Sequence, residues 1–123
     1  MEALNCKKLP VFSKANSKGT FDIVEAKSLD ELVEVLDSTK VLLVFNDDIV
    51  DEIDFDFTKI SKIIVVAPCE NNTTKAADIV IPIKTWLEKD GSFVNAMGTC
   101  QEFVSIVESD TLSEIEVIGK LNS

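Results

Sequence analysis

The sequence predicts a small α/β fold in which a parallel, Rossmann-like sheet of about three to four strands is flanked by helices. Three apolar runs support this prediction, at residues 41–45, 63–66 and 79–83. Each is apolar at successive positions, which is typical of strands buried on both faces. Intervals of roughly 12 to 17 residues separate the runs, enough for helical crossovers between parallel strands. The length of 123 residues fits one domain or a piece of a larger protein, and we expect a single α/β domain over residues 1–123.

The part of the chain before the first strand should contain one helix. Residues 1–20 show little periodicity and are expected to be partly irregular, with one candidate strand at residues 9–12. Ser28 and Glu31 form a capping box, which predicts that a helix starts there and ends near Ser38. Its apolar stripe consists of Leu29, Leu32, Val33 and Leu36.

The connections between the strands are predicted to be short. Residues 47–59 should form a helical turn followed by extended chain, and residues 71–77 a short helix capped by Asn71 or Thr73. Pro82 must lie at a strand end or on an edge, because it lacks an N–H group for the sheet. If the strands are buried on both faces, four side chains should be nearly inaccessible: Leu43, Ile64, Val65 and Val80.

The region after the third strand is predicted to turn and then to form a last helix. A turn over residues 85–89 should be closed at Gly91 by a left-handed backbone conformation, and the whole stretch 88–98 should be a structural turn. Residues 101–107 alternate between apolar and polar side chains. A capping box at residues 111–114 predicts a terminal helix lined by Leu112, Ile115, Ile118 and Leu121.

The composition excludes several classes of function. The net charge is −10, and all 12 basic residues are Lys, so the chain has neither Arg nor His. An acidic surface argues against a nucleic-acid partner, and the lack of Arg removes the bidentate phosphate clamp. We therefore assign no catalytic residue. Cys6, Cys69 and Cys100 are too far apart to form a metal-binding motif, and no metal site is predicted.

The sequence carries no sign of membrane insertion or secretion. No apolar run approaches the ~20 residues that cross a bilayer, and charged residues near the N-terminus argue against a signal peptide. The expected localisation is cytoplasmic. In that compartment the thiols should be reduced, and we expect Cys69 to be packed or inert instead of a nucleophile.

The longest informative stretch runs from residue 77 to residue 101. In it a strand ends in a proline and is followed by a glutamate, a glycine-hydroxyl-aromatic step, an asparagine and a further glycine. These residues are Pro82, Glu88, Gly91-Ser92-Phe93, Asn95 and Gly98. This order resembles the molybdopterin oxidoreductase superfamily. The likeness is greatest to the large iron-sulfur subunit of NADH-quinone oxidoreductase, respiratory complex I, and covers residue 10 to about residue 121, including residues 16–19, 26–32 and 45–48.

The resemblance implies a C-terminal portion of a longer protein, either a fragment or a small separate subunit. Active members of the family use iron-sulfur clusters and molybdopterin, but the motifs that hold the clusters and molybdenum precede this region, so no cofactor is expected in this chain. The positions that match the family's cofactor-binding motif are Glu88, Gly91, Asn95 and Gly98. Met97 and Thr99 flank the last glycine where the family has an acidic and a basic residue. We therefore expect these four positions to be structural.

Three functions follow as hypotheses. The first is a non-catalytic scaffold domain of the large iron-sulfur subunit, without activity alone, which contacts other subunits of a respiratory complex and supports electron transfer from NADH to quinone. The second is the cofactor-binding lobe of a formate dehydrogenase-like molybdoenzyme, with the strand ends facing a pterin. The third is a receiver-like signalling domain with Mg²⁺ at residues 46–48. The next strand, however, ends in Ala67-Pro68-Cys69 without a phosphate-accepting Asp.

Overall fold

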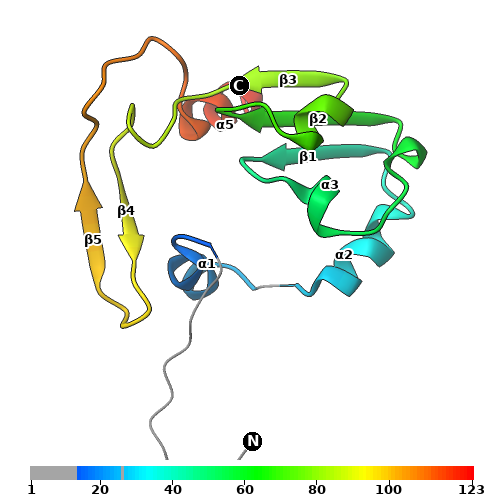
Figure 1. Cartoon of the computed structure of the whole chain (residues 1–123), viewed down its shortest axis with the longest axis horizontal. Helices are drawn as coiled ribbons and strands as arrows, with labels where there is room; N and C mark the ends of the chain where they lie inside the picture. Colours follow the sequence, from blue (N-terminus) through cyan, green and yellow to red (C-terminus); the bar gives the residue numbers. More distant parts are fainter. Residues whose placement is uncertain (1–13, 26) are drawn as a thin grey trace, which may run out of the picture. The chain divides into compact units, whose positions relative to one another are not determined.

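The computed structural model describes residues 14–25 and 27–123 (Figure 1). The candidate strand at residues 9–12 and Cys6 lie outside the described residues. The described residues form two compact units, each with its own small sheet. The larger unit contains residues 27–89 and 105–123, and the smaller unit contains residues 14–25 and 90–104.

The larger unit is built on a parallel sheet with the strand order β1-β2-β3. The strands are β1 at Val41–Phe45, β2 at Lys62–Ala67 and β3 at Ile79–Pro82. Val44 pairs with Val65, and Val65 pairs with Val80, so these three side chains lie on the same face. The predicted α/β fold with a parallel sheet is confirmed. Pro82 is the last residue of an edge strand, as its missing N–H group requires.

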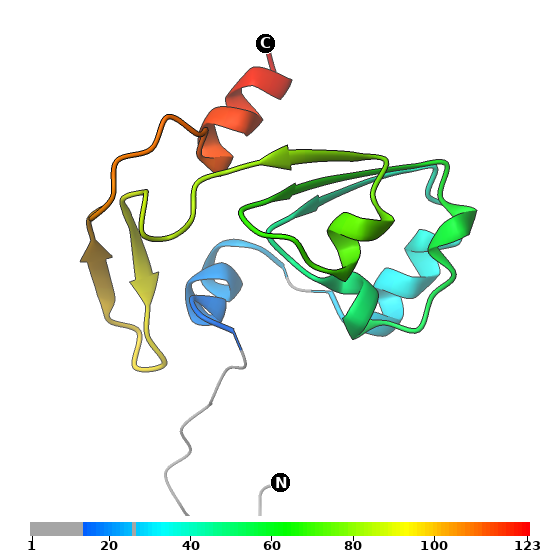
Figure 2. The ribbon, with the colours of Figure 1, turned by 45° about the horizontal axis from the view of Figure 1, so that its top comes forward.

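Helices cover both faces of this sheet. The helices α2 (Leu29–Leu36), α3 (Ile49–Glu52) and α4 (Asn72–Ala76) lie on one side, and α5 (Glu114–Leu121) lies on the other (Figure 2). A 3-10 turn, η1 (Phe57–Lys59), follows the extended chain after α3. The placement of α3 and α4 on one face is the usual result of right-handed crossovers between parallel strands.

Two of the predicted helix starts are confirmed by their caps. The Ser28 hydroxyl accepts a hydrogen bond from the Glu31 amide at 3.2 Å, and the Glu31 carboxylate accepts one from the Ser28 amide at 2.8 Å. At α4 the cap is Asn71, whose side-chain oxygen accepts a hydrogen bond from the Thr74 amide at 2.7 Å. Along the chain at residues 14–25 and 27–123, none of the helices has the length and apolar character needed to cross a membrane.

The apolar core consists of two clusters, one on each face of the sheet. The larger cluster, beneath α2 and α3, contains eight buried side chains: Leu36, Val44, Ile49, Ile53, Ile60, Ile63, Val65 and Ala67. The smaller cluster joins α5 to the other face through Val66, Ile83 and Val117. Phe45, Ile81 and Leu112 pack against it.

The prediction that the strands are buried on both faces is only partly correct. Val65 is fully buried, but Leu43 is 42% exposed, Val80 is 46% exposed and Ile64 is partly exposed. On the face of Leu43, α5 packs only near Val66, toward the carboxyl ends of the strands, and leaves the amino ends uncovered. Val80 lies on the edge strand β3, which has a neighbouring strand on one side only.

The terminal helix α5 begins later than predicted, because a different capping box forms. The Ser113 hydroxyl accepts from the Glu116 amide at 3.4 Å, and the Glu116 carboxylate accepts from the Ser113 amide at 2.7 Å. The predicted box at residues 111–114 is therefore wrong. Its groups have other partners: the Thr111 amide donates to the Ser109 hydroxyl at 3.3 Å, and the Glu114 carboxylate contacts Lys89. Leu112 packs in the smaller cluster, where its carbonyl accepts the Lys84 amide at 2.8 Å.

The predicted apolar stripe of this helix is also wrong in part. Val117 is the buried side chain that attaches α5 to the sheet. Ile115 is 82% exposed and Leu121 is 57% exposed. Ile115 is two positions before Val117, about 200° around the helix, and therefore points away from the sheet.

The smaller unit combines a short helix with a hairpin. Helix α1 spans Ser17–Ile23, and the strands β4 (Gly91–Val94) and β5 (Cys100–Phe103) pair antiparallel. Helix α1 was not expected, because residues up to 20 lack periodicity and include Gly19. Its start is tied to the hairpin by Asn16, whose side-chain oxygen accepts the Val94 amide at 2.9 Å. Strand β4 lies within the stretch 88–98 that was predicted to be a turn.

Candidate functional site

Glu88, the first residue of the cofactor-binding motif, closes a turn after β3. Its carboxylate accepts hydrogen bonds from the Thr85 amide at 2.8 Å and the Thr85 hydroxyl at 2.7 Å. These two bonds, together with one from Ser109 and the charge of Lys84, lower the pKa of Glu88. The side chain is therefore an ionised carboxylate, and its Oε2 atom holds both the amide and the hydroxyl of Thr85.

Asn95 shapes the tip of the β4-β5 hairpin. Its side-chain oxygen accepts hydrogen bonds from the Met97 amide and the Thr99 amide, both at 3.0 Å. The Asn95 backbone carbonyl accepts a hydrogen bond from the Gly98 amide at 2.9 Å, and the Asn95 amide donates one to the Thr99 carbonyl at 3.0 Å. The side-chain oxygen thus satisfies two backbone groups that the turn would otherwise leave unpaired.

The two glycines of the motif serve the same hairpin in different ways. Gly98 has a φ of +84°, a left-handed conformation that glycine adopts without strain. Gly91 does not have a positive φ, and the prediction that it closes a turn in this way is wrong. It lies in β4 opposite Phe103, and a Cβ atom at this position would be 2.6 Å from the Phe103 ring. Because Gly91 has no side chain, the Phe103 ring can lie over strand β4 and stack on the Phe93 ring, with 4.9 Å between the ring centroids.

The structure therefore brings together three of the four candidate residues. Gly91, Asn95 and Gly98 belong to one hairpin in the smaller unit, whereas Glu88 belongs to the larger unit. The four residues contact groups of the chain itself: backbone amides, the Thr85 and Ser109 side chains, and the Phe103 ring.

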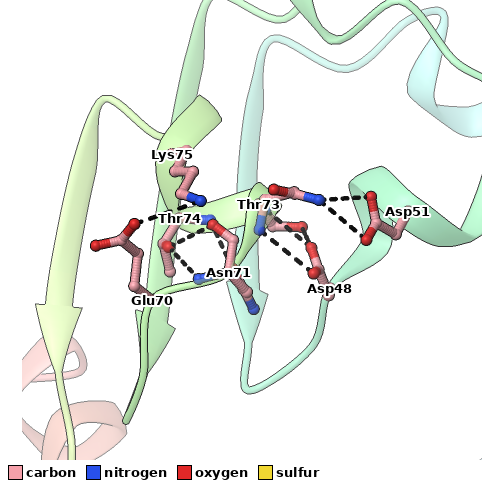
Figure 3. A network of polar contacts seen from close by, with 8 residues as sticks. Asp48, Asp51, Glu70, Asn71, Thr73, Thr74 and Lys75 are labelled. Atoms are coloured by element: carbon pink, nitrogen blue, oxygen red, sulfur yellow. Dashed lines mark hydrogen bonds and ion pairs between the residues drawn. The ribbon is translucent and has the colours of Figure 1, made fainter.

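A second group of polar residues lies at the carboxyl ends of the strands, between the first turns of α3 and α4 (Figure 3). Asp48 precedes α3, and its carboxylate reaches across to α4. One oxygen accepts the Thr73 amide at 2.9 Å and the Thr73 hydroxyl at 2.7 Å. The other accepts the Asn72 amide at 3.3 Å.

Thr73 connects the two helices. Its side chain is almost completely buried, with 1% exposed. The hydroxyl donates to Asp48 and accepts the Val50 amide at 3.1 Å, so it joins the starts of α4 and α3. A second link runs from the Asn72 side-chain amide to both carboxylate oxygens of Asp51, at 2.8 and 3.0 Å.

The hydrogen bond from the Thr73 hydroxyl is the largest cause that lowers the pKa of Asp48, and the bonds from the Thr73 and Asn72 amides and the charge of Lys75 act in the same direction. Asp48 is therefore ionised at neutral pH. The hypothesis of a receiver-like Mg²⁺ site used this residue as a ligand, but both of its oxygens accept hydrogen bonds from α4. Within residues 14–25 and 27–123, no three side chains of His, Cys, Asp or Glu gather into a metal-binding group.

Sequence reasoning considered Thr73 only as a helix cap and missed its contact with Asp48. A signal was present, because residues that follow neighbouring parallel strands meet at the same edge of the sheet. Asp48 follows β1 and Thr73 follows β2.

A surface hollow of about 450 Å³ lies near the carboxyl ends of β2 and β3. It is lined by Ala67, Pro68, Cys69, Glu70, Thr74, Lys75, Val80 and Pro82. The Lys75 ammonium is 3.4 Å from the Glu70 carboxylate. Cys69 is a free, exposed thiol, so of the two predicted alternatives, packed or inert, the packed one is excluded and the inert one stays a prediction. The loop at residues 68–70 carries it away from the core that buries the end of β2.

These residues do not fit a cofactor that carries phosphate groups. Phosphates are bound by Arg, by Lys or by unpaired amides at a helix start. The sequence has no Arg, and Lys75, the basic residue that lines the hollow, is paired with Glu70. The amides of Asn72 and Thr73 donate to Asp48.

Comparison with known proteins gives one match. The sequence profile of a family described as molybdopterin oxidoreductase matches residues 2–113, which is most of the chain. No curated protein and no solved structure shows significant similarity to it.

Proposed function

The chain belongs to the molybdopterin oxidoreductase family, and we propose that it is a non-catalytic scaffold domain of an oxidoreductase, similar to part of the large iron-sulfur subunit of NADH-quinone oxidoreductase. In this proposal the chain has no activity alone. It contacts other subunits of a respiratory complex in the cytoplasm, is held near the membrane only through that complex, and supports electron transfer from NADH to quinone in the assembly.

One observation supports a structural role above all: the motif residues bind the chain's own backbone. The Asn95 side chain holds the hairpin tip through two amides, and the Glu88 carboxylate holds the Thr85 amide and hydroxyl. The Asn95 side-chain oxygen and the Glu88 Oε2 atom are therefore already occupied, which leaves fewer hydrogen-bonding atoms for a cofactor. These contacts favour a scaffold over the cofactor-binding lobe of a formate dehydrogenase-like enzyme.

Deletion of the coding sequence in its own organism tests the proposal. We expect NADH-quinone reductase activity in membranes to fall together with the amount of assembled complex on native gels. Formate-dependent reduction should not change. Loss of formate-dependent reduction with intact NADH-quinone reductase would instead support the molybdoenzyme lobe, and loss of neither activity would contradict both.

Complementation with Asn95→Ala separates a scaffold from a cofactor-binding lobe. For a scaffold, the restored activity should follow the amount of the variant found in the complex. For a cofactor-binding lobe, the variant should assemble normally and remain inactive. Met97→Ala is the matched control, because this side chain lies in the same turn and is 78% exposed. It should restore both assembly and activity.

A further inference from the structure

The carboxyl edge of a parallel sheet is where α/β proteins usually hold phosphate groups. Helices that follow the strands start at this edge, and their first amides lack partners within the helix. In this chain α3 follows β1 and α4 follows β2, so both helix starts lie at that edge (Figure 3).

At α4, however, the amides have partners from the chain itself. The Asn72 and Thr73 amides donate to the Asp48 carboxylate, at 3.3 and 2.9 Å. The Thr74 amide donates to the Asn71 side chain at 2.7 Å, and the Asn71 amide donates to the Thr74 hydroxyl at 2.8 Å. At α3 the Val50 amide donates to the Thr73 hydroxyl.

We infer that Asp48 closes this edge of the sheet to phosphate-bearing cofactors: its carboxylate is an internal anion that holds the amides of Asn72 and Thr73. A carboxylate and a phosphate have the same sign of charge and accept the same kind of hydrogen bond. The inference goes beyond the proposed function and does not depend on which complex the chain joins.

Two features oppose displacement of Asp48 by a phosphate. The Thr73 hydroxyl is buried between the starts of α3 and α4, so a phosphate, which is larger than a carboxylate, could replace Asp48 as its acceptor only by opening this contact. A second carboxylate, Asp51, contacts the neighbouring Asn72 side chain and would repel an incoming phosphate.

The first test is a titration of the wild-type chain with inorganic pyrophosphate, followed by the ¹⁵N NMR signals of the backbone amides. The Asn72 and Thr73 amides should not shift in a saturable way. A saturable shift of these two signals in the wild-type chain would overturn the inference.

The second test is the same titration of Asp48→Ala, with Asp51→Ala as the matched control. Both variants remove one negative charge from the same edge, but only the first frees the two amides. Pyrophosphate should shift the Asn72 and Thr73 signals of Asp48→Ala with an affinity at least about tenfold higher than for Asp51→Ala. A folded Asp48→Ala variant that responds no more than the control would also overturn the inference.

If Asp48→Ala does not fold, Asp48→Asn replaces it: its one acceptor oxygen can still hold Thr73, but the charge is removed and the Asn72 amide loses its acceptor, so the Asn72 signal is the one to follow. The titration of the wild-type chain remains decisive in either case. A deletion that leaves NADH-quinone reductase unchanged would contradict the proposed function and would not affect this result.

Discussion

Val65→Ala and Val80→Ala form a matched pair that tests how the sheet is buried. The two residues pair in register on neighbouring strands, so their side chains lie on the same face. Val65 is fully buried, whereas Val80 is 46% exposed. The loss of strand propensity is the same type of change at both positions and largely cancels in the comparison.

The expected magnitudes follow from burial. Val→Ala removes two carbon groups, and each buried group contributes about 0.8 kcal/mol. At Val65 this gives about 1.6 kcal/mol, and the cavity left between the strands and helices raises the loss to about 2–3 kcal/mol. At Val80 about half of the transfer free energy is lost and no closed cavity forms, so we expect about 0.5–1 kcal/mol.

Denaturant unfolding followed by far-UV circular dichroism measures both free energies of unfolding. The slope of the free energy against denaturant concentration should stay at the wild-type value, which shows that the variants unfold from the same compact state. Equal losses at the two positions, within about 0.5 kcal/mol, would refute the assignment of Val65 to the core and Val80 to an open edge.

Other predictions concern the hairpin and the response to acid. Gly91→Ala should lower the free energy of unfolding by more than about 1 kcal/mol, because its Cβ would lie 2.6 Å from the Phe103 ring. Gly119→Ala, with open space around its position in α5, should raise the free energy of unfolding by up to about 1 kcal/mol. Denaturant unfolding that finds Gly91→Ala at least as stable as Gly119→Ala would contradict this prediction. Asn95→Ala should cost about 1 kcal/mol and speed hydrogen exchange of the amides at residues 97 and 99, and unchanged exchange would count against its role in the turn. The pKa of Asp78 is lowered, first by the Ile63 amide and then by Lys62, so its contribution to stability is complete above the ordinary value of 3.8 and is lost as pH falls through the lower folded value. The free energy of unfolding, measured from pH 7 to pH 2, should show this loss, and the loss should be smaller in Asp78→Asn than in the wild-type chain.

The elements that the sequence predicted correctly have local causes. The capping box at Ser28 and Glu31 needs only residues three apart, and both of its bonds form. The apolar runs at residues 41–45, 63–66 and 79–83 mark the three parallel strands, although β3 ends at Pro82, one residue before the third run ends.

The elements that were wrong depend on packing between distant residues. Boxes starting at Thr111 and at Ser113 both satisfy the local pattern, and the contact of Leu112 with the smaller cluster decides between them. In the same way, a run of apolar residues does not reveal which of its two faces a helix covers. Leu43 is exposed because the packing of α5 stops short of it.

The candidate site shows why a motif alone is weak evidence for a cofactor. Gly98 supplies a left-handed residue, Asn95 supplies an oxygen for two amides, and Gly91 leaves room for the Phe103 ring. Each residue type is therefore needed by the hairpin itself, whether or not a ligand binds. The residue that bears on cofactor binding is instead Asp48, which the motif does not contain. Asp48 contacts α4 only because the segments after β1 and β2 meet at one edge of the sheet. The charge that opposes phosphate binding can therefore be identified from the structure but not from the motif.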